Sequence, residues 1–160
     1  MELRKVLGVV VVFATVAMCS SCTVPQDGVM GIAREDNGGF SLLTRMCSGH
    51  VDGFTVYHSD GPDGDGTDHT EDFDVPVTSE ARYDVTSLVR KLNPEIEEYS
   101  VYAWSTDNSS SARGPNFSTA QLSALSPGQI LATNYADDSF GISALDTQGF
   151  EASVASYCDD

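Results

Sequence analysis

The sequence predicts an all-β protein, a single antiparallel β-sandwich domain that follows a cleaved signal segment. Short runs of β-branched and aromatic residues recur along the chain, separated by Gly, Asn, Asp and Pro, as is typical of a sandwich or barrel. No stretch keeps the apolar period of 3.6 residues that marks an amphipathic helix. The chain of 160 residues, 41% of them hydrophobic, is long enough for one buried core but too short for two ordinary domains.

Ten segments combine β-forming residues with flanking turn residues, and each is expected to form a strand. Clear breaks at 36–39, 93–94, 108–114 and 127–128 separate several of them. Residues 86–92 could instead form a helical turn, because apolar residues follow an i, i+3 spacing there. The expected strands are Val29–Arg34, Phe40–Met46, Gly53–Ser59, Phe73–Thr78, Tyr83–Val89, Tyr99–Ser105, Phe117–Leu122, Gln129–Tyr135, Ser139–Leu145 and Ala152–Tyr157.

The first residues have the features of an export signal. Arg4 and Lys5 precede an uncharged run, Val6–Met18. As a helix this run reaches about 20 Å, which is too short for a hydrocarbon core of about 30 Å. We therefore expect a targeting segment rather than a membrane span or a core element.

The end of this segment contains a candidate processing site. Ser20-Ser21-Cys22 resembles the lipobox of bacterial lipoproteins, in which small residues precede a Cys that receives a diacylglyceryl group and becomes the new N-terminus. Cys19 stands where that family usually has an aliphatic residue. Ordinary secretory cleavage at Thr15-Val16-Ala17 is the alternative.

The lipobox resemblance implies both a domain organisation and a location. The partner would be the membrane, through a lipid anchor at Cys22, and the protein would lie on the extracytoplasmic face of the cell membrane. Without acylation it would be secreted. The implied parts are a lipoprotein signal peptide at 1–21, a short tether at 22–27 and the β-sandwich domain at 28–160.

The cysteines fit the same interpretation. Loss of the signal removes Cys19 and acylation uses Cys22, which leaves Cys47 and Cys158 as an even pair in an exported chain. We expect these two to form a disulfide, and two buried free thiols are the alternative. In the chain-entropy model a bridge of this span contributes about 4–5 kcal/mol.

One segment resembles the E-to-F corner of fibronectin type III and other immunoglobulin-like domains. Leu92-Asn93-Pro94 precedes Tyr99, after which Val101 and Ala103 alternate. The resemblance implies that the Tyr99 hydroxyl bonds back to the corner backbone while its ring packs in the core. Trp104 is out of phase with this alternation, so it belongs to the opposite face as a second-layer core residue or an exposed contact.

The layout as a whole resembles small lipoproteins predicted in actinobacterial genomes. The resemblance implies a surface β-domain and no particular activity. The shared features are a Cys-Thr-Val-Pro start, a Gly-Val-x-Gly-Ile strand at 28–32, and a Cys-x-x-His-x-Asp-Gly run formed by Cys47, His50, Asp52 and Gly53.

The acidic segment 60–74 is the candidate cation site. It holds seven carboxylates in fifteen residues, and Asp alternates with Gly in its first half. Carboxylates on tight turns suit Ca²⁺, so Asp63, Asp65 and Asp68 are the candidate ligands, and Ca²⁺ is the one possible cofactor. The EF-hand pattern fails, since Asp68 stands where that loop needs Gly and Asp74 where it needs Glu. The alternative is a solvated loop that keeps an exported protein soluble.

Catalytic motifs are missing from the sequence. It contains no Gly-x-Ser-x-Gly elbow and no Ser-x-x-Lys pair, and Lys91 is the only lysine after the signal. His58 precedes the acidic segment and His69 lies within it, so a His-plus-carboxylate metal site can be drawn there, with surface histidines as the alternative. Paired carboxylates for hydrolysis leave no sequence signature, since their test is spatial separation.

Charge and motifs together favour a non-enzymatic protein. The 24 acidic residues against 8 Lys and Arg give a net charge of −16, which argues against a nucleic-acid partner. We expect a binding or interaction module with a protein or envelope partner, and the polar loop 105–116 is a candidate binding surface. The alternatives are a calcium-binding surface domain and, third, a small carboxylate-dependent hydrolase.

Overall fold

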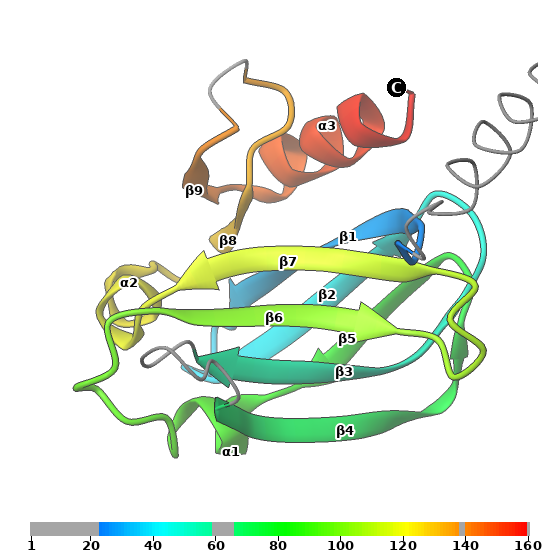
Figure 1. Cartoon of the computed structure of the whole chain (residues 1–160). Coiled ribbons are helices and arrows are strands. Elements are labelled where there is room, and N and C mark those ends of the chain that lie inside the picture. Colours follow the sequence, from blue (N-terminus) through cyan, green and yellow to red (C-terminus); the bar gives the residue numbers. More distant parts are fainter. Residues whose placement is uncertain (1–22, 59–65, 138–139, 160) are drawn as a thin grey trace, which may run out of the picture.

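The computed structural model describes residues 23–58, 66–137 and 140–159, without the side chains of 66–68. Within these residues the chain forms a nine-stranded mixed sheet and three helices (Figure 1). In chain order the elements are β1 (Gln26–Arg34), β2 (Phe40–Met46), β3 (Val51–His58), β4 (Gly66–Val77), β5 (Glu80–Asp84), α1 (Thr86–Val89), β6 (Tyr99–Trp104), β7 (Ser111–Phe117), α2 (Thr119–Ala124), β8 (Ile130–Thr133), β9 (Ile142–Leu145) and α3 (Thr147–Cys158).

β1 lies in the middle of the sheet. One of its edges pairs with β2, and the other is shared by β7, which runs parallel to its first half, and β8, which is antiparallel to its second half. The strand order is β4-β3-β6-β7-β1-β2-β5, and β9 extends β8. The parallel β1–β7 pair makes the sheet mixed, which differs from the wholly antiparallel arrangement expected.

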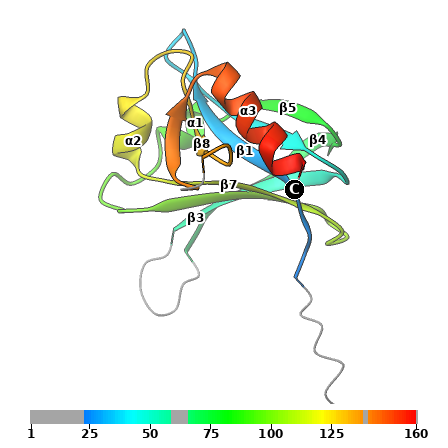
Figure 2. The same cartoon turned by 90° about the horizontal axis from the view of Figure 1, so that it is seen from above.

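The sheet curls until its two ends come together, so that it is nearly a barrel (Figure 2). β4 and β5, the two ends of the strand order, are joined by Thr78 and Ser79. Away from this corner, Tyr83 of β5 donates a hydrogen bond to Glu71 of β4, and the rings of Phe73 and Tyr83 lie 5.8 Å apart. Side-chain contacts therefore connect the two sheet ends along this seam.

Two hydrophobic clusters lie on the two faces of β1. The larger fills the interior of the curled sheet and includes the buried rings of Tyr99 and Phe117. The smaller lies outside, where Phe150 of α3 packs against β1, β2 and β8. Gly31 permits this close packing, because a Cβ there would lie 2.6 Å from Cγ2 of Ile130. Burial on both faces explains the continuous apolar run of β1.

The all-β expectation is confirmed for most elements, and β2 has the expected bounds. The expected strand Phe117–Leu122 is wrong, since only Phe117 is in a strand and α2 follows. The Ser118 hydroxyl accepts from the Gln121 backbone N–H, and the Gln121 side chain accepts from the Ser118 N–H. This capping box satisfies two backbone donors and starts a helix.

The expected strand Ala152–Tyr157 is also wrong, because it lies within α3. The Asp146 side chain caps this helix by accepting from the Gly149 backbone N–H at 2.7 Å. The helical alternative for 86–92 is confirmed in its first part as α1. None of the described helices is both long and apolar enough to cross a membrane.

The expected tyrosine corner is confirmed. The Tyr99 hydroxyl accepts from the Asn93 backbone N–H at 2.9 Å and donates to the Asn93 carbonyl at 3.1 Å. Its ring is 1% exposed and stacks on Phe117 at 5.7 Å. The corner does not by itself establish an immunoglobulin or fibronectin sandwich, and that finer assignment stays a prediction.

Cys47 and Cys158 lie at disulfide distance, with 1.98 Å between their sulfurs and 5.3 Å between their Cα atoms. The expected pair is therefore adjacent, and it joins the turn after β2 to the end of α3. Next to it, the Tyr157 hydroxyl donates to the Gln26 carbonyl at 2.8 Å. The last turn of α3 is thus fixed to the start of β1.

Candidate functional site

A groove of about 740 Å³ crosses the outer face of β4, β3 and β6 and is bounded by the N-terminal segment and the β6–β7 turn. None of its described lining residues is charged, although the chain carries a net charge of −16. The lining residues are Val24, Gln26, Thr55, Thr70, Tyr102, Trp104, Ser105, Thr106, Asn108, Ser110 and Ser111.

Trp104 is the largest side chain in this groove. It alternates with the buried Val101 and Ala103, so β6 presents it on the outer face, as the sequence predicted. Its indole N–H donates to the Thr55 hydroxyl at 3.1 Å. Gly53 of the neighbouring strand makes room for the ring, because a Cβ there would lie 2.6 Å from Trp104 Cζ2. The indole is therefore held in one orientation against β3.

Hydroxyl groups continue across the groove from Trp104. The Thr55 and Thr70 hydroxyls, on β3 and β4, lie 3.1 Å apart. Tyr102 is 40% exposed, and its ring meets that of Tyr57 edge-on at 5.8 Å. Because these strands pair in a fixed register, the outer face combines flat aromatic surface with polar groups that can donate and accept hydrogen bonds.

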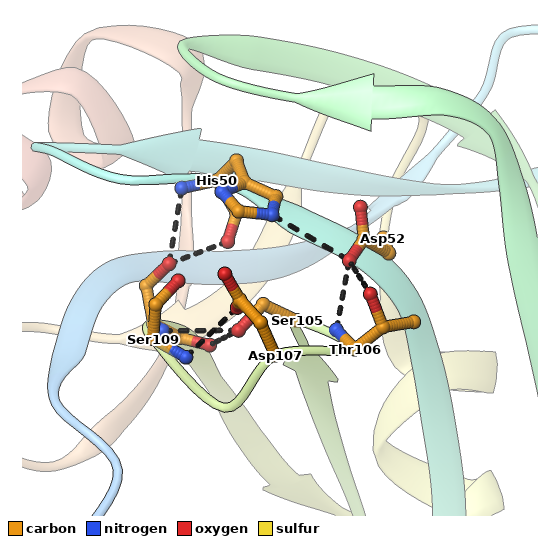
Figure 3. Close-up of polar contacts among 7 residues, drawn as sticks. His50, Asp52, Ser105, Thr106, Asp107 and Ser109 are labelled. Carbon is orange, nitrogen blue, oxygen red and sulfur yellow. Dashed lines mark hydrogen bonds and ion pairs between the residues drawn. The ribbon is translucent and has the colours of Figure 1, made fainter.

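The turn at one end of the groove is held by Asp52 (Figure 3). The Asp52 carboxylate accepts from the Thr106 backbone N–H and hydroxyl, both at 2.8 Å. These two hydrogen bonds, the backbone one first, lower the pKa of Asp52. His50 lies 3.6 Å from the same carboxylate. Asp52 is therefore an ionised support for the turn.

The rest of this turn is supported by short-range hydrogen bonds. Asp107 accepts from Ser109, which lowers its pKa to about 2. The Ser110 hydroxyl donates to the His50 backbone carbonyl and accepts from the His50 backbone N–H. The side chains drawn in Figure 3 therefore hold the β6–β7 turn against the start of β3.

A second hollow, of about 400 Å³, lies next to the β4–β5 seam, between β4 and α1. Its lining includes His69, Glu71, Asp84 and Lys91. Glu71 accepts hydrogen bonds from Tyr83 and from His69, the latter at 2.8 Å. Chiefly because of the bond from Tyr83, the pKa of Glu71 is lowered. The same bond raises the pKa of Tyr83 to about 12. These groups stabilise the seam.

The calcium prediction is not tested by the described residues. Asp63 and Asp65 lie outside them, and Asp68 is in β4 without a described side chain. In the part of the chain that is described, no group of three or more His, Cys, Asp or Glu side chains could hold a metal ion. Cys22 and the expected signal segment 1–21 also lie outside the described residues, so neither prediction is tested.

The two histidines proposed for a His-plus-carboxylate site, His58 and His69, both have structural neighbours. His69 bonds to Glu71, and the ring of His58 lies 6.0 Å from that of Tyr99. The sequence reasoning missed Tyr57, Tyr102 and the Thr55–Thr70 pair. Alternation along the expected strands was the available signal for Tyr102, since it shares a face with Trp104.

Comparisons of this chain with protein-family models, with curated proteins and with solved structures gave no match.

Proposed function

We propose that this protein is a non-catalytic binding module, exported and anchored through a lipid on Cys22 at the extracytoplasmic face of the cell membrane. Its site is the groove around Trp104, and its ligand is a neutral, polyhydroxylated molecule, namely a glycan of the cell envelope. The export signal and lipobox-type segment support the location. The groove supports the binding role.

The observation that carries the proposal is the fixed indole of Trp104 in an uncharged, hydroxyl-rich groove. A sugar ring has one relatively apolar face that can lie on an aromatic ring, and hydroxyls on its edge that need hydrogen-bond partners. The exposed lining residues Thr70, Thr106 and Asn108 offer such partners. An ionic ligand would find no opposite charge among the lining side chains, so the chemistry favours a neutral one.

The non-catalytic part of the proposal rests on the roles of the nearby ionisable groups. Asp52 and Asp107 accept hydrogen bonds that hold the β6–β7 turn, and both have lowered pKa values. A general acid at neutral pH needs a raised pKa. These carboxylates therefore suit support of a binding surface better than proton transfer.

Trp104 is the only tryptophan of the chain, so its fluorescence reports on the groove directly. We would titrate the purified exported protein with cellohexaose, chitohexaose and mannohexaose. At least one of these oligosaccharides should change the Trp104 emission in a saturable way. Thr70→Val should lower the affinity for that oligosaccharide several-fold. Val75→Ala, a change at an exposed residue outside the groove, is the matched control. No saturable response to any of the three would refute the glycan-binding proposal.

The anchoring part has a separate test. The full chain would be expressed in an actinobacterial host, and the membrane and medium fractions compared with those of a Cys22→Ala variant. We expect the parent chain in the detergent phase with a mass increase matching acylation. Equal partitioning of the two proteins would remove the lipid anchor from the proposal and leave a secreted module.

A further inference from the structure

The Trp104 groove is one end of a longer surface. A hollow of about 240 Å³ adjoins it and shares Gln26, Tyr102 and Ser111 with its lining. A third hollow, of about 420 Å³, shares Arg113, Gly114 and Asn116 with the second. Because each hollow has lining residues in common with the next, the three form one path across the outer face of the sheet.

The path follows β6, which lies beside β7 on the near side of Figure 1. Outward residues of this strand are two positions apart, and Trp104, Tyr102 and Ser100 line the hollows in that order. Glu98, just before the strand, lines the third hollow. The six residue-to-residue steps of extended chain from 98 to 104 span about 20 Å. This length exceeds what a single sugar ring would cover.

The middle of the path is polar and internally bonded. The Ser100 hydroxyl donates to the Asn116 side-chain oxygen at 2.8 Å, and the Asn116 side-chain nitrogen donates to Glu98 at 3.2 Å. Tyr57 and Tyr102 stand edge-on beside these groups. Among the described residues that line the three hollows, Arg113 is the single cation and Glu98 the single carboxylate. The described lining is therefore close to neutral.

The far end of the path carries a second aromatic group. Phe140 is 60% exposed, and its ring lies 6.3 Å from that of Tyr135. Its backbone has a φ of +47°, a left-handed conformation that is unfavourable for a bulky residue. Ile142, next to it in the same hollow, is 36% exposed. An apolar platform thus ends the path opposite Trp104.

From this continuity we infer that the occupant is a linear neutral polymer that lies along β6, with one sugar ring on Trp104 and a distant ring on the Tyr135–Phe140 platform. The inference rests on the proposed function, because it extends the same site. Aromatic platforms at both ends with hydrogen-bonding groups between them suit a repeating chain. A small glycan would use the Trp104 end alone.

The test is the dependence of affinity on chain length. We would measure binding of cello-, chito- and manno-oligosaccharides, from disaccharide to hexasaccharide, by calorimetry and by Trp104 fluorescence. For the series that binds, the hexasaccharide should bind at least tenfold more tightly than the disaccharide. Phe140→Ala should lower the affinity for the hexasaccharide by about tenfold, the equivalent of about 1.4 kcal/mol, and leave the affinity for the disaccharide unchanged. Tyr102→Ala should lower the affinity for both oligosaccharides.

Two results would overturn the inference and leave the proposed function standing. One is equal affinity for short and long members of a series, and the other is an unchanged hexasaccharide affinity in Phe140→Ala. Failure of every series to bind would refute the proposed function itself. The peptide (Ala-Gly)₃ serves as an extended, neutral competitor of another class. Saturable binding of this peptide at Trp104 in place of the sugars would assign the path to peptides. Thermal melts of each variant would verify that it folds.

Discussion

The tyrosine corner allows a quantitative test of the fold. In Tyr99→Phe the ring stays buried against Phe117, but both hydrogen bonds to the Asn93 backbone are lost. A net hydrogen bond contributes about 0.5–1.5 kcal/mol. Because Asn93 is exposed and water can reach its backbone, we use the lower half of that range for each bond. The expected loss is about 1–2 kcal/mol, or roughly 3–8 °C in Tm for a domain of this size.

The assay is urea unfolding of the oxidised protein, with Trp104 fluorescence and far-UV circular dichroism as separate probes. Tyr57→Phe is the matched control, because the Tyr57 hydroxyl makes no hydrogen bond to a described residue and the ring contact with Tyr102 is kept. We expect a change below 0.5 kcal/mol for the control, as for most surface substitutions. Equal midpoints for Tyr99→Phe and Tyr57→Phe would refute the corner as a stabilising contact.

Three further predictions follow from the cysteine pair, the seam and the acidic segment. Replacing both Cys47 and Cys158 by Ser should lower the unfolding free energy by up to about 4–5 kcal/mol, and an unchanged urea midpoint would exclude a bridge in the exported protein. The lowered pKa of Glu71 stabilises the fold above the unfolded carboxyl pKa, and this contribution is lost as pH falls through the lowered folded value. The raised pKa of Tyr83 stabilises the fold fully below its unfolded value near 10, and this contribution is lost as pH rises through about 12. Tyr83→Phe should therefore flatten the stability profile at both extremes, and an unchanged profile would contradict the seam contact. If the acidic segment binds Ca²⁺, the Tm in 1 mM CaCl₂ should exceed that in EDTA by several degrees, and Asp65→Asn should abolish the difference; identical melts would assign the segment to solubility.

The strands were predictable where local pattern and tertiary environment agree. β2 places four large apolar residues among seven between turn residues, and its bounds match the prediction. α3 was not predictable from the same kind of pattern, because its sequence mixes Gly, Ser and Val, which favour helices weakly. It forms because Asp146 caps its start and Phe150 packs on the sheet. The spacing of Asp146 and Gly149 was the local signal that could have been read.

The candidate site was predictable only in part. The alternation in β6 placed Trp104 on the face opposite the core, and the structure confirms that placement. The groove also depends on Thr55 and Thr70. Strand register brings Thr55 next to Trp104 and Thr70 next to Thr55. The support of Thr106 by Asp52 joins residues 54 positions apart. Such contacts depend on the closed fold and leave no periodic trace in the sequence.

The central position of β1 also sets how the protein would respond to mechanical load. An anchor on Cys22 and a polymer bound in the groove would place the domain under tension between the membrane and the envelope. A pull on the anchor would enter the domain through Gln26, at the start of β1. The hydrogen bonds of β1 to β2 and β7 lie across the strand direction, so any component of load along β1 would stress them together in shear rather than open them one after another. In that geometry the anchored domain would resist unravelling from its tether.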